Sequence, residues 1–127
     1  MKPKFRAWNS ETKEIEVFNT YEEISELFLA LSADDGFYSI MQSTGLKDKN
    51  DKEIFEGDIL ACKTDDEVIN LNIFWDEEHA LFMFESKKYN EQEPLAELVE
   101  NNTYPFEIIG NIYENRELLE VIDEKRK

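Results

Sequence analysis

An alternating run of apolar side chains over residues 68–75 is the feature that most constrains the fold. In it Ile69, Leu71, Ile73 and Trp75 alternate with Val68, Asn70, Asn72 and Phe74. This period of two is typical of a β-strand, and the two asparagines indicate that one face is partly wet. The polar residues 76–79 follow, and residues 80–85 form a second apolar run. We therefore predict an antiparallel hairpin with a four-residue loop.

Other segments also have the character of short strands. Residues 59–63 follow a turn at residues 55–58, and residues 104–113 contain Gly110, which marks a bulge or a point of close approach. Asn50 and Asp51 both tolerate positive φ and predict a tight turn within residues 46–54. Several short strands with turn signals between them predict a mainly β fold, a small barrel decorated by helices.

Three segments have helical patterns. Residues 20–31 begin with Thr20 and Glu23, the spacing of a capping box. Their apolar side chains fall at helical spacing and predict a face directed toward the core or toward another subunit: Ile24, Leu27, Phe28 and Leu31. Pro94 can open a short helix over residues 94–99. Asn115 can cap a last helix over residues 116–124.

The charge is strongly unbalanced. The chain has 127 residues with 30 Asp and Glu against 14 Lys and Arg, a net charge of −16. No cationic surplus exists to neutralise phosphates, so we expect neither direct nucleic-acid binding nor binding to an anionic membrane. The acidic excess lies in residues 14–38 and 64–100. Six residues of the second block are candidates for a surface that faces a partner: Asp65, Asp66, Glu67, Asp76, Glu77 and Glu78.

The inventory of reactive side chains is small. A single cysteine, Cys62, cannot form an intramolecular disulfide. His79 is the one histidine that could act as a base for Ser86 or Cys62, and no motif surrounds it. Residues 48–59 fail as a calcium loop, because Glu53 and Ile59 stand where the loop needs Gly and a bidentate Glu. We expect no enzyme activity, no metal and no cofactor. No apolar run is long enough to span a membrane and no signal core is present, so we expect a cytosolic protein.

Three blocks resemble the YopX family of bacterial phages and prophages. They are KFRAWN at residues 4–9, MQSTGLKDKNDKEIFEGDI at residues 41–59, and IGNIYEN at residues 109–115 with ELL at 117–119. The resemblance implies a phage lineage and an SH3-like barrel with an N-terminal extension, and it brings no catalytic residues with it. Asp51 stands where the family usually has Gly.

These observations predict one domain over residues 1–127. Residues 1–38 are its extension, with the helix at 20–31. Residues 39–113 form the barrel, and residues 115–124 form the C-terminal helix.

Two hypotheses on function follow. The first is a phage or prophage accessory protein without catalysis, which acts through protein–protein contacts and self-associates. The alternative is an acidic mimic of nucleic acid that inhibits a basic host protein. A metal-dependent enzyme is a third reading, supported only by the carboxylate clusters.

Overall fold

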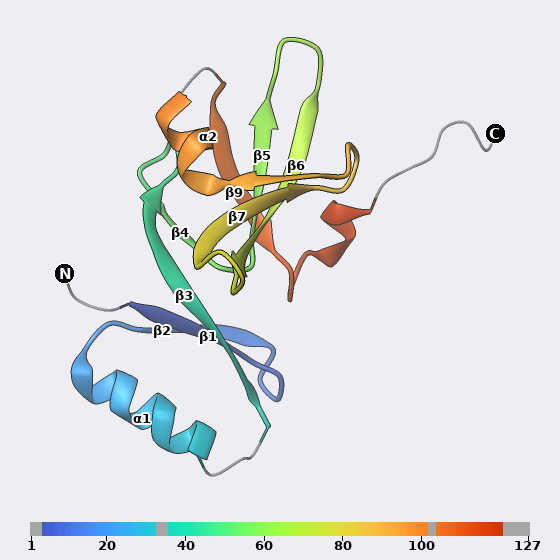
Figure 1. Ribbon diagram of the computed structural model, residues 1–127. Coiled ribbons are helices and arrows are strands. Elements are labelled where there is room, and N and C mark those ends of the chain that lie inside the picture. Colours follow the sequence, from blue (N-terminus) through green and yellow to red (C-terminus); the bar gives the residue numbers. More distant parts are fainter. Residues whose placement is uncertain (1–3, 33–35, 102–103, 121–127) are drawn as a thin grey trace. The chain divides into compact units, whose positions relative to one another are not determined.

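A computed structural model describes residues 4–32, 36–101 and 104–120 (Figure 1). These residues divide between two compact units, 1–43 and 44–127. The elements of the first unit are β1 (Phe5–Asn9), β2 (Glu14–Phe18), α1 (Tyr21–Ser32) and the beginning of β3 (Tyr38–Lys47). The second unit holds the end of β3 and β4 (Glu53–Phe55), β5 (Asp58–Lys63), β6 (Val68–Asp76), β7 (Leu81–Ser86), β8 (Glu91–Pro94), α2 (Leu95–Asn101), β9 (Phe106–Asn111) and the 3-10 helix η1 (Arg116–Leu119).

In the first unit, one amphipathic helix lies on a small antiparallel sheet. Strand β1 is central and pairs with β2 on one side and β3 on the other. The rings of Phe28 on α1 and Phe5 on β1 meet edge to face, with their centroids 5.9 Å apart. Ile24 and Leu27 are buried, as predicted, whereas Phe28 is 48% exposed. The predicted apolar face is therefore only partly directed inward, and the side chain of Leu31 lies outside the described residues.

The predicted capping box begins α1. The backbone N–H of Glu23 donates to Oγ1 of Thr20 at 3.1 Å, and the N–H of Thr20 donates to Oε1 of Glu23 at 3.2 Å. Each side chain thus satisfies a donor that the first turn of a helix leaves without a partner.

Replacing Thr20 with alanine removes one of these acceptors. We expect Thr20→Ala to lower the free energy of unfolding by about 1 kcal/mol. Urea denaturation followed by circular dichroism measures this loss. Thr20→Ser keeps the hydroxyl and serves as the matched control, and equal losses in both variants would contradict the capping role.

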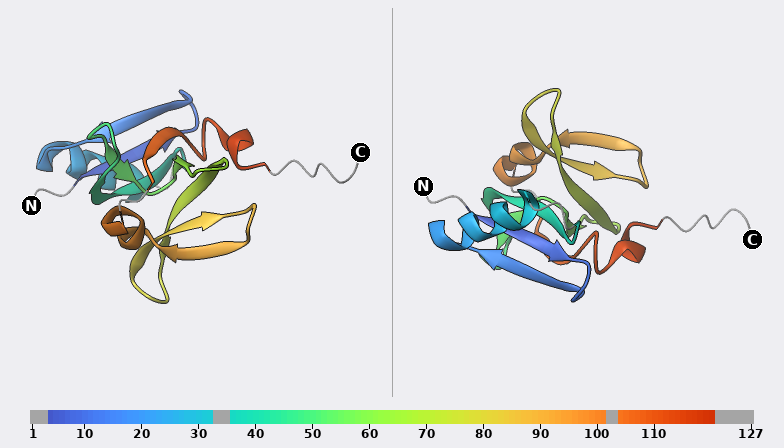
Figure 2. Two further views of the ribbon diagram at one scale, coloured as in Figure 1. Left: turned by 90° about the horizontal axis from the view of Figure 1, so that it is seen from above. Right: turned by 90° about the horizontal axis from the view of Figure 1, so that it is seen from below.

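A five-stranded antiparallel sheet in the order β8-β7-β6-β5-β9 forms most of the second unit. Asp76 pairs with Leu81, which leaves the predicted four-residue loop at residues 77–80. Figure 2 shows β7 and β8 as a hairpin that extends away from β5 and β9, with α2 at its base. The prediction of a mainly β fold is confirmed in this coarse form: two helices accompany curled antiparallel sheets that make a half-barrel.

One cluster of buried side chains forms the core of the second unit. Its buried residues come from β4, β5, β6, β9 and α2: Ile54, Leu60, Cys62, Leu71, Ile73, Leu95 and Phe106. The alternation that predicted β6 is confirmed here, because Leu71 and Ile73 are buried while Asn70 and Asn72 are half-buried.

Two predicted helices differ in the structure. Pro94 ends strand β8, and the helix begins one residue later at Leu95. In place of the last predicted helix, the described residues form one 3-10 turn, Arg116–Leu119, and Glu120 is extended. Asn115 makes no side-chain capping bond because its side chain is engaged elsewhere. Residues 121–124 of that predicted helix lie outside the described residues.

Candidate functional site

Asp48, in the middle block of the resemblance, holds the β3–β4 loop and strand β9 together. Its Oδ1 accepts hydrogen bonds from the backbone N–H of Asn50 and of Lys52, both at 2.9 Å. Its Oδ2 accepts from the N–H of Ile108 on β9, also at 2.9 Å. Asp51 has a φ of 63°, so the predicted turn with positive φ forms without the usual glycine. This carboxylate therefore joins segments 60 residues apart.

The surroundings of Asp48 act on its pKa in both directions. Burial raises the pKa, but the hydrogen bonds from Ile108, Lys52 and Asn50 and the charge of Lys52 outweigh it, so the pKa lies below its ordinary value. A lowered pKa stabilises the fold above the pKa of the unfolded chain, near pH 4, and this stabilisation disappears as the pH falls through the folded value.

A pH series tests this assignment. We expect the stability difference between the natural chain and Asp48→Asn to be largest above about pH 4 and to shrink toward pH 2. Urea denaturation of both proteins at each pH measures it. Because both chains share all other carboxylates, their difference isolates Asp48, and a difference that is constant with pH would contradict the assignment.

The turn that follows has an equally structural role. Asp58 is 1% exposed, and its Oδ2 accepts from the N–H of Phe55 at 2.8 Å. Gly57 has a φ of 88°, a region that side chains disfavour. Its N–H donates to the carbonyl of Ile73, and its carbonyl accepts from the N–H of Ile112. The residues of the middle block thus build turns and sheet edges.

The last block is also structural. Strand β9 pairs Gly110 with Ile59 and Ile108 with Leu60, so Ile109 is an extra residue and the predicted bulge is present. A Cβ on Gly110 would lie 2.4 Å from Oδ1 of Asn115. That same oxygen accepts from the N–H of Asn111 at 3.2 Å. Gly110 therefore lies both at a bulge and at a point of close approach, as the sequence predicted.

The six acidic candidates fall into two groups at opposite ends of β6. Asp65, Asp66 and Glu67 belong to the β5–β6 turn, whereas Asp76 ends β6 and Glu77 and Glu78 begin the β6–β7 turn. Nine residues of strand separate the two turns, a distance of about 25–30 Å at the usual rise per residue. The structure does not bring the two groups together into one acidic surface.

Two of the six carboxylates already have partners within the chain. Glu67 accepts hydrogen bonds from the ammonium of Lys88 and the hydroxyl of Tyr89. These bonds lower the pKa of Glu67, and the bond from Lys88 has the larger effect. The same contacts raise the pKa of Lys88 and of Tyr89. Asp76 lies 2.8 Å from Nδ1 of His79, and this hydrogen bond lowers the pKa of Asp76. Asp65, Asp66, Glu77 and Glu78 are exposed.

Among the described residues, the side chains needed for nucleophilic catalysis do not meet. Cys62 is buried, and burial raises the pKa of its thiol, which disfavours the reactive thiolate. The hydroxyl of Ser86 accepts from the N–H of Tyr89, while His79 lies exposed in the β6–β7 turn. Ligand atoms of Asp76, Glu78 and His79 lie within 4.8 Å of one another, close enough to share a cation.

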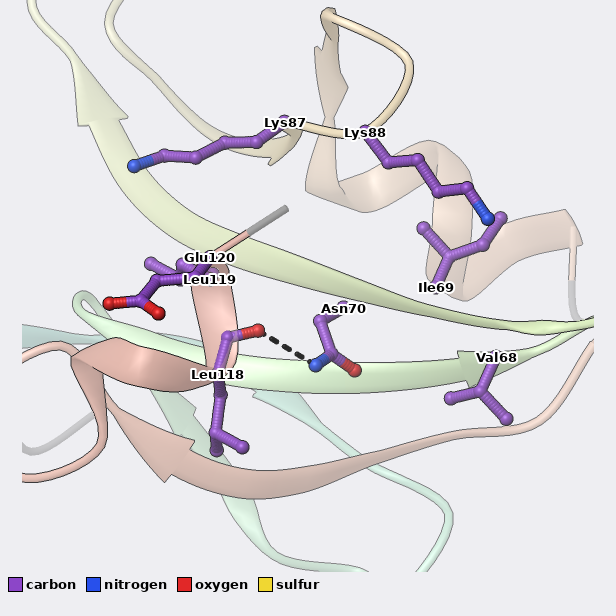
Figure 3. A pocket seen from close by; sticks show the side chains of 8 residues that line it. All are labelled: Val68, Ile69, Asn70, Lys87, Lys88, Leu118, Leu119 and Glu120. Atoms are coloured by element: carbon purple, nitrogen blue, oxygen red, sulfur yellow. Dashed lines mark hydrogen bonds between the residues drawn. The ribbon is translucent and has the colours of Figure 1, made fainter. Parts of the chain in front are cut away.

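A pocket of about 250 Å³ opens where β6 begins (Figure 3). Residues of three segments line it: Val68, Ile69 and Asn70 of β6, Lys87 and Lys88 of the β7–β8 turn, and Leu118, Leu119 and Glu120 at η1. Nδ2 of Asn70 donates to the carbonyl of Leu118 at 2.8 Å and fixes η1 beside the strand. The sequence analysis missed this pocket because its residues are distant in the chain.

Helix α1 also exposes two apolar side chains outside the predicted stripe, which the sequence analysis missed. Tyr21 and Leu29 are 71% and 69% exposed, and with Phe28 they stand at positions i, i+7 and i+8. This spacing places the three side chains on one side of the helix. We call Tyr21, Phe28 and Leu29 the α1 apolar face. Exposed apolar side chains that gather in this way mark interaction surfaces more often than single ones do.

The family model described as YopX protein matches residues 4–120. The crystal structure of protein EF1440 from Enterococcus faecalis is similar, with 28% identity and a TM-score of 0.63 over 93% of this chain and 98% of that one. The crystal structure of protein yopX from Bacillus subtilis has the same fold, with 16% identity and a TM-score of 0.61 over 94% of this chain and 100% of that one. No curated protein matched.

The fold thus defines a mainly β protein, in which the residues of the middle and last blocks form turns and sheet edges. This chain belongs to the YopX family, as the resemblance predicted. None of its helices, within the ranges that the structure describes, is long and apolar enough to cross a membrane.

Proposed function

We propose that this protein is a phage or prophage accessory protein of the bacterial cytosol that works without catalysis, through protein–protein contacts, and that it self-associates. We also propose that its second unit is a barrel of the SH3-like type. The observation that carries the functional proposal is the α1 apolar face, on which Tyr21, Phe28 and Leu29 are exposed. The adjacent side of α1, with the buried Ile24 and Leu27, packs on the sheet, and Phe28 at the border contacts Phe5.

The residues around this face favour a second copy as its occupant. Ser25 lies between Tyr21 and Phe28 on the same side of α1 and is exposed, so the face has a small residue at its centre. Small residues allow two helices to approach closely, and a two-fold axis would bury the same side chains of both copies. Glu22 and Glu26 flank the face and leave a charged rim.

Charge predicts how this association responds to salt. Two copies each with a net charge of −16 repel each other, and salt screens this repulsion. Self-association through an apolar face should therefore strengthen as salt is raised. A complex between an acidic mimic and a basic partner should weaken instead, because its attraction is screened.

Sedimentation equilibrium over a series of protein and salt concentrations tests the proposal. We expect a mass above that of one chain, rising with salt, and a single-chain mass for Tyr21→Ser/Leu29→Ser with an unchanged unfolding midpoint. Val68→Ser removes an exposed apolar side chain of the second unit and is the matched control. A single-chain mass for the natural protein at every concentration would contradict the self-association.

The acidic mimic remains the second candidate, and its support is narrower. Four exposed carboxylates, Asp65, Asp66, Glu77 and Glu78, favour it, but they stand in two separate turns. A partner cleft would have to contact both ends of β6 at once. Capture of one stoichiometric basic protein that dissociates with salt, unaffected by the α1 substitutions, would favour this candidate over the first.

A further inference from the structure

The edge of β6 is open over its first half. Strand β5 pairs with Val68–Asn72 on one side of β6, whereas β7 pairs only with Asn72–Asp76 on the other. In the described part of the chain, Val68, Ile69, Asn70 and Leu71 therefore have no strand on the β7 side. Along such an edge, alternate residues present backbone N–H and C=O groups that a further strand can bond.

The pocket lies beside this open edge. Figure 3 shows the side chains of Lys87 and Lys88 leaving one turn in opposite directions, with Leu118 on η1 and Val68 and Ile69 along the strand. Val68 is 52% exposed, so an apolar side chain from outside can reach it. An extended segment placed along the edge would direct every second side chain toward one face of the sheet.

The charges at the pocket select a carboxylate. Residues 64–100 contain two lysines, Lys87 and Lys88, and no arginine. Lys88 is neutralised by Glu67, but Lys87 is exposed and makes no ion pair within the described ranges. Glu120 also lines the pocket, so a ligand carboxylate must lie on the lysine side.

Lys88 and Tyr89 now reach across the edge to Glu67, the residue before β6. Lys88 and Tyr89 are exposed and Glu67 is half-buried, and pairs with solvent access are weak and are readily exchanged for water or for another ligand. An incoming strand therefore has to displace the side chains of Lys88 and Tyr89 from Glu67.

We propose that the open edge of β6 binds an extended peptide segment of a partner protein by strand addition, with one apolar side chain in the pocket and one carboxylate against Lys87. This site lies in the second unit and is separate from the α1 apolar face, so it goes beyond the proposed self-association.

Fluorescence polarisation with defined peptides tests the site. The probes are four labelled heptapeptides, acetyl-Thr-Val-Thr-X-Thr-Glu-Asp-amide, in which X is Val, Ile, Leu or Phe, at about physiological salt. We expect at least one to bind the full chain. Lys87→Glu should weaken binding about ten-fold or more, while Lys47→Glu, the same change at an exposed lysine of β3, should leave it unchanged. A proline at X should abolish binding, because proline cannot donate to the edge.

Amide hydrogen exchange on the best complex locates the contact. Two alternate amides among Val68–Leu71 should exchange more slowly with peptide than without it. No binding by any of the four peptides up to about 1 mM, or binding that leaves these amides unprotected or ignores Lys87→Glu, would overturn the proposal. Protection of the same amides by raised protein concentration alone would also overturn it, because the occupant would then be a second copy.

Discussion

Asp48→Ala lowers the free energy of unfolding by about 3 kcal/mol, because three backbone N–H groups lose their acceptor. A hydrogen bond to a charged group contributes about 1.5–3 kcal/mol. Water replaces the lost carboxylate only partly, so the total stays near the value of one or two such bonds. The three donors are the backbone groups of Asn50, Lys52 and Ile108. Asp48 itself is buried, so solvent access to the vacated site is restricted. Chemical denaturation of both proteins at pH 7 measures the loss.

Asp51→Asn is the matched control for Asp48→Asn. Both substitutions exchange a carboxylate for an amide in the same loop, but Asp51 is an exposed residue with a φ of 63°, a conformation that asparagine tolerates well. We expect no loss from Asp51→Asn and a clear loss from Asp48→Asn. If Asp48→Ala lay within about 0.5 kcal/mol of the natural chain, as ordinary surface substitutions do, the loop would not be held by this carboxylate.

Gly110→Ala is the second substitution with a large expected effect, about 2–3 kcal/mol of lost stability, from overpacking and from a broken hydrogen bond. The new methyl group would lie 2.4 Å from Oδ1, 2.7 Å from Cγ and 2.8 Å from Cβ of Asn115. The side chain of Asn115 must move, and the N–H of Asn111 then loses its acceptor.

A double-mutant cycle separates this clash from a backbone effect. Asn115→Gly removes all three atoms that the methyl group would meet. On that background we expect Gly110→Ala to cost less than half of what it costs alone. Equal costs on both backgrounds would place the strain in the backbone of the bulge and would contradict the role given to Asn115.

The sequence predicted those elements whose residue pattern matches the burial of their side chains or depends only on neighbouring residues. The strand at residues 68–75 alternates because one of its faces is buried, and the capping box of α1 depends only on neighbouring residues. Strand β8 was missed because Glu91, Gln92 and Glu93 are all exposed at the edge of the sheet and show no alternation. The last helix was predicted too long. Asn115 is of a residue type that often caps helices, but its side chain accepts a hydrogen bond from Asn111 instead.

The candidate surfaces were less predictable, because they depend on tertiary placement. The acidic residues were found by charge, but only the fold reveals that β6 separates them and that Lys88 and Tyr89 hold Glu67. In α1 the helical period identified one apolar stripe, whereas the helix has apolar side chains on two sides. The pocket joins a strand, a turn and η1, and no local pattern connects these segments.

The central claim is that the α1 apolar face joins two copies of this chain. A spin label at Glu26→Cys, on the exposed flank of that face, tests it by electron–electron dipolar spectroscopy. The natural Cys62 is buried with a raised thiol pKa, so the label is directed to the new cysteine. We predict one narrow distance distribution whose signal grows with protein concentration and disappears in the Tyr21→Ser/Leu29→Ser background. A signal absent at concentrations where the chain is dimeric, or unaffected by those substitutions, would contradict the claim.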